Sequence, residues 1–407
     1  MVKSVIKLPE VYESVIRMKS SDFTEHRFGH LVATIAGQMA FVPDNLPPRV
    51  QWTPELVTVL SDANQAIGQL QGVGFQLPNP SLLITPFIRR EAEMSSRIEG
   101  TQASIEQLYL FEVEERRIES KVPDVREVYN YTRALEYGLK RSQELPVCLR
   151  MICELHEILL KDVRGQQRAP GQFRKVQNWI GTQRCPIEQA RYVPPPLEQM
   201  TAALDAFEKF INSPLENLPV LVWLAMVHYQ FEAIHPFIDG NGRIGRLLIT
   251  LLLCVKKVLD KPLLYISGYF ERNRQQYYDR LLEVSTHGRW TEWIFFFLRG
   301  VIEQSKDAFE RARQLMDLQQ KFRKRVHSAK RSALQIRLID LLIERPVITI
   351  RYVSKYFDVT YTTAKNNISK LVKVGILTEA TGARRNRVYI AREVLKIITE
   401  PSVIGNW

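Results

Sequence analysis

The spacing of apolar residues, which recur every three to four positions along most of the chain, most constrains the fold. This spacing gathers apolar side chains on one face of an α-helix, whereas a half-buried strand needs strict alternation. The pattern breaks between Gly171 and Pro196, where β-branched and aromatic residues flank a turn-prone segment. We therefore expect a mainly α-helical protein with a small β-hairpin over residues 173–193. At 407 residues, the chain is long enough for two or three domains.

Positive charge is concentrated at the C-terminal end. Residues 301–407 carry 21 Lys and Arg against 10 Asp and Glu, out of a formal net charge of +12 for the whole chain. Such asymmetry favours a polyanionic partner, and a basic but merely solvated surface explains it equally well. No apolar run reaches the roughly 18 residues of a membrane span, and no secretory signal is recognisable. The four cysteines lack paired spacing. The sequence thus predicts a cytoplasmic protein without a membrane partner.

A helix is expected over about residues 85–99. Thr85 and Pro86 form a start signal, because a proline at the first helical position loses no hydrogen bond. Gly100 is a suitable end, since glycine readily adopts the left-handed conformation. Ser104, with Gln107 three residues later, predicts a capping box that opens another helix.

The most informative stretch is His235-Pro-Phe-Ile-Asp-Gly-Asn-Gly-Arg-Ile-Gly-Arg246. An apolar helix over roughly residues 219–234 must end before the proline, because a residue that precedes proline is pushed out of the α region. The glycine-rich turn that follows opens a second helix, over about residues 243–256, and presents free N–H groups that suit phosphate. Arg243 and Arg246 lie on one face of that helix and can reach the same anion.

This stretch resembles the Fic family signature, H-P-F-x-D/E-G-N-G-R-x-x-R, at every specified position. The resemblance implies an all-α Fic core with a β-hairpin flap, which binds ATP and Mg²⁺ and transfers AMP to a Ser, Thr or Tyr hydroxyl. In that reaction His235 is the general base and Asp239 holds the magnesium ion. The nucleotide contacts that the resemblance implies are Glu99, Asn178, Trp179, Ile180, Gly181, His235, Gly240, Asn241, Gly242, Arg243, Ile244, Gly245, Arg246, Tyr277 and Tyr278. For the two tyrosines, an ordinary role in the core stays open.

Two further segments extend the resemblance. Residues 173–193 resemble the Fic flap, whose edge pairs with the target protein through backbone bonds. Ser95 to Gly100 match the inhibitory pattern Ser/Thr-x-x-x-Glu-Gly, and Ser95 and Glu99 share one helical face. The resemblance implies that Glu99 pairs with Arg246 and keeps the γ-phosphate from its productive position, so that the enzyme is autoinhibited.

The last 76 residues predict a helix, a helix–turn–helix and a basic hairpin, which is the order of a winged helix-turn-helix. A protein-docking or regulatory module is the alternative to DNA binding. The candidate DNA contacts are Thr362, Thr363, Lys365, Asn366, Arg384, Arg385 and Arg387.

The sequence therefore predicts four parts, which are an N-terminal helical region with the inhibitory helix (residues 1–110), a Fic catalytic core (111–300), a connecting helix (301–331) and a winged helix-turn-helix domain (332–407). Two alternatives to the autoinhibited AMP transferase stay open. One is a DNA-binding regulator whose Fic core senses nucleotide or is inert. The other is a Fic enzyme that transfers a different phosphate-containing group or removes AMP. The target protein and the oligomeric state, a homodimer included, also stay open.

Overall fold

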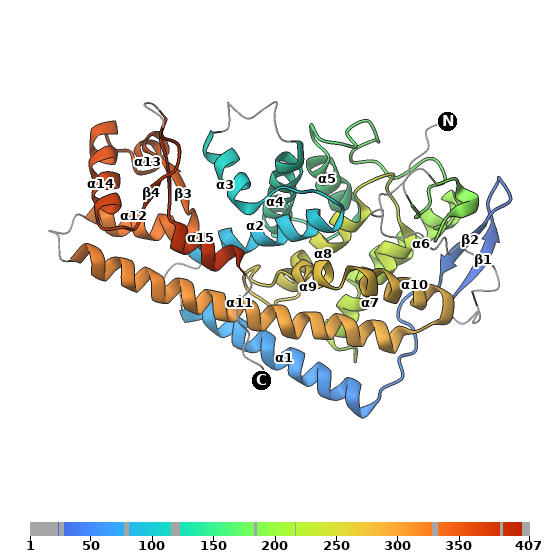
Figure 1. The fold of residues 1–407 in the computed structure, drawn as a ribbon. Coiled ribbons are helices and arrows are strands. Elements are labelled where there is room, and N and C mark those ends of the chain that lie inside the picture. Colours follow the sequence, from blue (N-terminus) through green and yellow to red (C-terminus); the bar gives the residue numbers. More distant parts are fainter. Residues whose placement is uncertain are drawn as a thin grey trace.

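The computed structural model describes residue 23 and residues 28–76, 81–114, 123–182, 185–215, 217–327, 333–382 and 386–400. The expectation of a mainly helical protein is confirmed (Figure 1). The helices are α1 (Pro54–Gln76), α2 (Ser81–Ile98), α3 (Ile105–Glu114), α4 (Pro123–Arg141), α5 (Leu149–Leu159), α6 (Leu197–Asn212), α7 (Val220–Ile234), α8 (Asn241–Val255), α9 (Ser267–Arg272), α10 (Arg274–His287), α11 (Trp290–His327), α12 (Ala333–Glu344), α13 (Ile350–Phe357), α14 (Tyr361–Lys373) and α15 (Arg392–Thr399). The strands are β1 (Gly29–Ala33), β2 (Met39–Pro43), β3 (Val347–Thr349), β4 (Thr378–Glu379) and β5 (Val388–Ile390).

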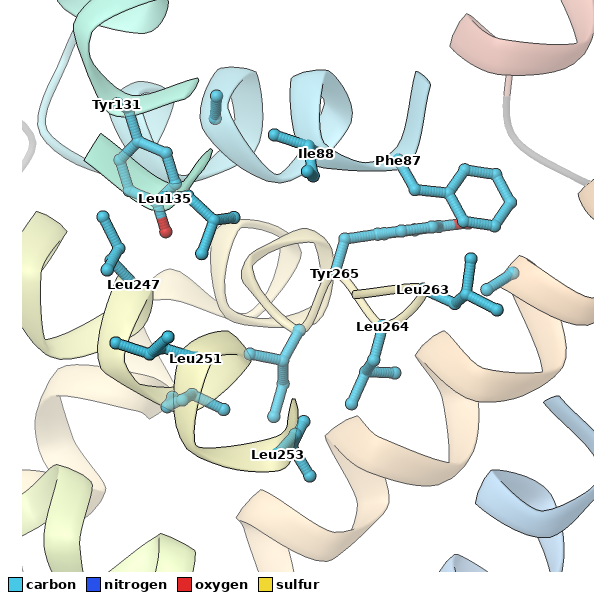
Figure 2. Packing of buried hydrophobic residues seen from close by; sticks show 14 of the residues in the cluster. Phe87, Ile88, Tyr131, Leu135, Leu247, Leu251, Leu253, Leu263, Leu264 and Tyr265 are labelled. Carbon is cyan, nitrogen blue, oxygen red and sulfur yellow. The ribbon is translucent and has the colours of Figure 1, made fainter. Parts of the chain in front are cut away.

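Helix α7 is the central element, and nearly all of its side chains are buried. It packs against α8, which in turn contacts α4 and α5. Helix α2 joins the same core although it lies far from α8 in the sequence. Figure 2 shows Phe87 and Ile88 of α2 in one packed cluster with Tyr131 of α4 and Leu251 of α8. Burial of this apolar surface therefore positions the C-terminal end of α2 beside the start of α8.

The expected connecting helix is part of a longer one. Helix α11 begins at Trp290, eleven residues before the predicted start, and runs without interruption to His327. Its first turns belong to the core, because Trp293 and Phe297 are fully buried there. Farther along, α11 packs beside α1 and reaches the C-terminal elements (Figure 1).

The C-terminal elements run α12, β3, α13, α14, β4, β5, α15, and the antiparallel sheet has the order β3-β5-β4. They pack on α2, α3 and α11. Arg90 of α2 donates to the Ile398 carbonyl oxygen at 2.5 Å, and Thr85 donates to Glu344 at 3.2 Å. The assignment of this region as a winged helix-turn-helix stays a prediction. Of the candidate DNA contacts, Arg384 and Arg385 lie outside the described residues.

Helix α2 differs from the prediction at its start. It begins at Ser81, so Pro86 lies inside the helix and not at its first position. The four added residues include Leu82 and Leu83, whose burial against the core favours extension of the helix. At the other end, Gly100 has the expected left-handed conformation, with φ 89°.

The capping box at α3 is confirmed. Ser104 Oγ accepts from the Gln107 amide at 3.2 Å, and Gln107 Oε1 accepts from the Ser104 amide at 2.9 Å. By contrast, the N-terminal region is not purely helical, because β1 and β2 pair as an antiparallel hairpin before α1. The prediction missed this hairpin.

The flap has less strand structure than predicted. In the described part of residues 173–193, isolated bridge positions take the place of continuous strands, and Ile180 pairs with Tyr192. In the first half of the flap, the side chains of Arg174 and Asn178 donate to the backbone carbonyl oxygens of His235 and Phe237 in the loop before α8. Beyond the bridge, the Val193 carbonyl oxygen accepts from the Phe41 amide of β2 at 2.9 Å. The flap is therefore a loop that is held against the core and the N-terminal hairpin.

Among the helices described, none combines the length and the apolar character that crossing a membrane requires.

Candidate active site

The loop between α7 and α8 has a conformation that its sequence explains. Helix α7 ends at His235, whose backbone is left-handed with φ 49°. Gly240, with φ 82°, precedes the first turn of α8, and glycine adopts that conformation without strain. Asn241 closes the loop, because its side chain accepts from the Phe237 amide and donates to the Phe237 carbonyl oxygen, both at 2.8 Å.

His235 has the tautomer that a general base requires. Its Nδ1 lies 3.2 Å from the Glu232 carbonyl oxygen, which can only accept, so the neutral ring carries its proton on Nδ1. Its Nε2 is buried and has no hydrogen-bond partner among the described residues. Burial lowers the pKa of His235 to about 4, and the nearby Arg174 guanidinium also disfavours the imidazolium. The ring is therefore neutral at pH 7, with the Nε2 lone pair available.

A single pocket brings most of the predicted site residues together. Besides His235, it is lined by the glycine-rich start of α8, by three flap residues, by Glu99 directly after α2 and by side chains from α7 and α10. The predicted residues that line the pocket are Glu99, Ile180, His235, Asp239, Gly240, Asn241, Gly242, Arg246 and Tyr278.

Arg246 is held by Ser95 of α2 and by Glu99, the residue directly after that helix. Its Nη2 donates to Glu99 Oε1 at 2.7 Å, and its Nε donates to Ser95 Oγ at 2.9 Å. Arg246 is fully buried. Burial alone would lower its pKa, but the Glu99 carboxylate raises it; conversely, Arg246 outweighs the effect of burial and lowers the pKa of Glu99. The pair is thus ionised and joins residues 147 positions apart.

Glu99 also covers the start of α8. A Cβ atom added at Gly242 would lie 2.4 Å from Glu99 Oε1 and 2.9 Å from Arg246 Nη1. The carboxylate therefore lies directly over the glycine that the sequence assigned to the phosphate cradle. Because the first N–H groups of an α-helix lack partners within the helix, this position favours an anion.

Asp239 is the acidic residue of the loop. Its side chain is about a third exposed (36%), and Oδ1 accepts from the Gly240 amide at 2.7 Å. Its backbone oxygen lies 2.9 Å from Nε2 of the buried His156, whose ring stacks on Phe237. The described residues contain no group of three or more metal-binding side chains. A magnesium ion fits a single carboxylate, because Mg²⁺ takes its other ligands from phosphates and water.

Several predicted contacts lie away from the pocket lining. Arg243 lies behind Asp239, with its nitrogens 3.5 Å from Glu127 and 3.6 Å from the Asp239 carboxylate. Tyr277 is buried, and its hydroxyl contacts His228 at 2.8 Å. The predicted residues outside the described lining are Asn178, Trp179, Gly181, Arg243, Ile244, Gly245 and Tyr277.

Asn178 faces the loop between α7 and α8, which is called the motif loop from here on. Its side-chain nitrogen donates to the Phe237 carbonyl oxygen at 2.8 Å and to that of His235 at 3.3 Å. Trp179 instead donates to the Cys185 carbonyl oxygen within the flap at 3.0 Å.

The sequence interpretation missed Glu232, His156 and Arg174. Glu232 lines the pocket, and its buried Oε1 has no hydrogen-bond partner in the described structure. Burial raises its pKa to about 8, although Arg246 acts in the opposite direction. Its position three residues before His235 could have indicated it, because α7 ends between them and their backbones must be close. No local signal distinguishes His156 or Arg174, since their partners are distant in the sequence.

Comparison with known proteins agrees with this geometry. Residues 57–140 match the Fic/DOC family N-terminal model, and residues 146–253 match the Fic/DOC family model. The protein adenylyltransferase Fic of Drosophila grimshawi is 34% identical over 129 residues, which are 31% of this chain and 24% of that protein. This chain thus matches only about a quarter of the length of that relative.

Solved structures show the same fold. A Fic family protein from Desulfovibrio desulfuricans G20 aligns over 85% of this chain and 98% of its own, with a TM-score of 0.56 and 18% identity. Fic-1 from C. elegans (residues 134–508) aligns over 65% of this chain and 75% of its own, with a TM-score of 0.51 and 19% identity. From its two family segments and the fold around them, this chain contains a Fic/DOC-family domain.

Proposed function

We propose that this chain is a protein adenylyltransferase, which transfers AMP from ATP to a Ser, Thr or Tyr hydroxyl of a target protein and of itself. The observation that carries the proposal is the common pocket of the unpartnered His235 Nε2, the glycine-rich start of α8 and the buried Arg246. The relative named protein adenylyltransferase supports the type of reaction.

In the proposed reaction, the hydroxyl oxygen of the target attacks the α-phosphorus of ATP. The bond from that phosphorus to the oxygen bridging to the β-phosphate breaks, and pyrophosphate leaves. His235 Nε2 takes the hydroxyl proton, which its neutral state permits. Backbone N–H groups at Asn241 and Gly242 hold phosphate oxygens where the helix dipole favours negative charge. The target segment lies along the flap, where backbone bonds align its hydroxyl with His235.

Asp239 is the residue that would hold Mg²⁺ in this scheme. Its partly exposed carboxylate on the pocket wall supports that role. The ion would neutralise phosphate charge. Arg243 lies beside Asp239, so its role in this scheme would be to orient that carboxylate and not to contact the nucleotide.

We further propose that Glu99 inhibits the resting enzyme. Two observations support inhibition, namely the 2.7 Å ion pair to Arg246 and the position of the carboxylate over Gly242. A phosphate group at the start of α8 would meet a like charge in the same place. Displacement of Glu99 would free both the arginine and the phosphate cradle.

Parallel incubations with ATP labelled at the α- or the γ-phosphate test the reaction. Transfer of AMP leaves label on protein from the α position alone. Label from the γ position alone would mean phosphorylation and would overturn the proposal. Loss of label from protein that already carries AMP would indicate the removal reaction.

A second function, DNA binding through the C-terminal region, is favoured by the surface of α14. Ala364, Ile368 and Leu371 of this helix are buried. The opposite face is polar and partly basic, and its exposed residues include Thr362, Thr363, Lys365 and Asn366. Such a face suits phosphate and base edges. Arg387 would contribute from the hairpin that precedes α15.

A further inference from the structure

The backbone of His235 needs external support. A left-handed conformation is uncommon for a residue with a side chain and costs of order 1–3 kcal/mol, so the surrounding structure must hold it. Helix α7 supplies one contact, because the His235 amide donates to the Phe231 carbonyl oxygen at 3.0 Å. The carbonyl oxygen of His235, however, points out of the helix. Its two donors come from the flap, namely Arg174 Nε at 3.1 Å and Asn178 Nδ2 at 3.3 Å.

Arg174 has no acidic partner in the described residues. The guanidinium is 2% exposed and donates to three backbone carbonyl oxygens, those of His235 at 3.1 Å, Pro195 at 2.5 Å and Val176 at 3.4 Å. Its own amide donates to the Pro236 carbonyl oxygen at 2.9 Å. Burial lowers the pKa of Arg174 to about 10, which still leaves it charged at neutral pH.

Burial of the Arg174 charge without an acidic partner costs folding free energy, which packing alone would not require. A buried charge without a counter-ion loses hydration and recovers only part of it through hydrogen bonds. What the guanidinium does accomplish is geometric, because its planar fork reaches both the carbonyl oxygen of His235 and that of Pro195, two residues after the end of the flap. Lysine, with a single nitrogen, cannot span two carbonyl groups in this way.

We propose that Arg174 is a positioning residue for AMP transfer, which ties the flap to the backbone of His235 and so fixes the imidazole relative to the hydroxyl that the flap presents. This inference rests on the proposed function and deepens it. The flap and the base then move as one unit. A target segment that pairs with the flap is thereby aligned with Nε2 without a contact between the target and Arg174.

The test uses the full chain with Glu99→Gly, so that autoinhibition does not mask the result. Arg174→Gln keeps one donor but removes the fork, and Arg174→Lys keeps the charge. The matched control is Arg311→Gln on α11, which removes an equally buried guanidinium whose partners, Asp307 and the Ile397 carbonyl oxygen, lie outside the motif. For each protein, kcat for self-modification is measured with α-labelled ATP, together with the Kd for ATP and the melting temperature.

We expect Arg174→Gln to lower kcat by about a hundred-fold, the loss typical of a misplacement near 1 Å, while the Kd for ATP stays within about twofold. Arg174→Lys should lie between Arg174→Gln and the parent. Arg311→Gln should lower the melting temperature without lowering kcat. A purely structural role would not lower kcat in Arg174→Gln while leaving the Kd for ATP unchanged, nor would it spare kcat in the destabilised Arg311→Gln.

Three results would overturn the inference. One is a kcat for Arg174→Gln equal to that of the Glu99→Gly parent. Another is a loss of kcat that Arg311→Gln reproduces at a similar melting temperature. If Arg174→Gln does not fold, a normal kcat in the folded Arg174→Lys variant would also decide against it. Absence of α-label transfer in the Glu99→Gly parent itself would instead overturn the proposed function, and the role of Arg174 with it.

Discussion

The loop between α7 and α8 and the exposed face of α14 are both rich in polar residues, yet their environments are opposite. His235 in the loop, and Asn241 and Arg246 in the first turns of α8, are at most 4% exposed. On α14, Thr362 and Lys365 face solvent. A buried polar group that lacks a hydrogen-bond partner costs a few kcal/mol, so most buried polar groups have partners. Those partners fix the orientation of the group. An exposed group can remain unpaired at little cost. A specific reaction can therefore be inferred from the buried region, whereas only a class of partner can be inferred from the exposed one.

The largest expected effect is loss of transfer on removal of the buried imidazole. In the Glu99→Gly background, His235→Ala should lower the rate of α-label transfer by about a hundred- to ten-thousand-fold, because the target hydroxyl loses its base. The Kd for ATP should change little, since Nε2 acts on the hydroxyl and not on the phosphates. Rates within a few-fold of the parent would remove His235 from this role and weaken the contrast between the two regions.

The next effect is a gain of activity. Glu99→Gly should raise self-modification by about tenfold or more, equivalent to about 1.4 kcal/mol, because Arg246 and the phosphate cradle are released together. The double variant Glu99→Gly with Arg246→Ala should lose the gain, since the freed guanidinium produces it. Labelling with α-labelled ATP at equal protein concentration measures all three proteins. Unchanged labelling in the single variant would mean that the ion pair is structural and not inhibitory.

The buried neutral histidines of the core make the free energy of unfolding depend on pH. The C-terminal region does not contribute to this effect, because it has no histidine from residue 333 onward. Burial lowers the pKa of His228 to about 3 and that of His156 to about 4. Between those values and the ordinary value near 6.5, the unfolded chain binds more protons than the folded one. The free energy of unfolding therefore falls on acidification below about pH 6.5, by up to about 1.4 kcal/mol per pH unit for each such histidine.

Urea unfolding at several values between pH 7 and pH 5 measures this slope. His228→Gln should reduce the slope by about one proton, because glutamine does not titrate. His30→Gln, which replaces a histidine at an exposed position, is the matched control. A slope that is the same in wild type and in His228→Gln would mean that His228 is not held neutral in the folded protein.

The smallest expected effect concerns α14. If the exposed face binds DNA, retention of the full chain on duplex DNA should weaken steeply with salt. Lys365→Ala should reduce the slope of log affinity against log salt by about 0.9, the value for one phosphate contact. Lys140→Ala, on the exposed surface of α4, is the control. Absence of retention even at low salt would favour protein docking and would leave the motif loop as the only region with an inferred ligand.

The sequence predicted the parts of the site that depend on near neighbours. The end of α7 at His235, the glycine-rich start of α8 and the capping box at Ser104 each follow from residues within one helical turn. The flap prediction was only partly right, because a strand was expected where Asn178 turns its side chain toward the motif loop. β-branched composition alone does not reveal whether a segment has a partner strand or bonds to the core.

What the sequence determined by itself is the set of reactive groups and their order along twelve residues. What only the tertiary structure decided is the partner of each buried charge. Arg246 pairs with Glu99 across 147 positions, whereas Arg243 turns toward Glu127. Arg174 bonds to the carbonyl oxygen of a histidine 61 positions away. The physical reason is that local patterns restrict backbone conformation over a few residues, while hydrogen-bond partners in a dry interior depend on how distant helices pack.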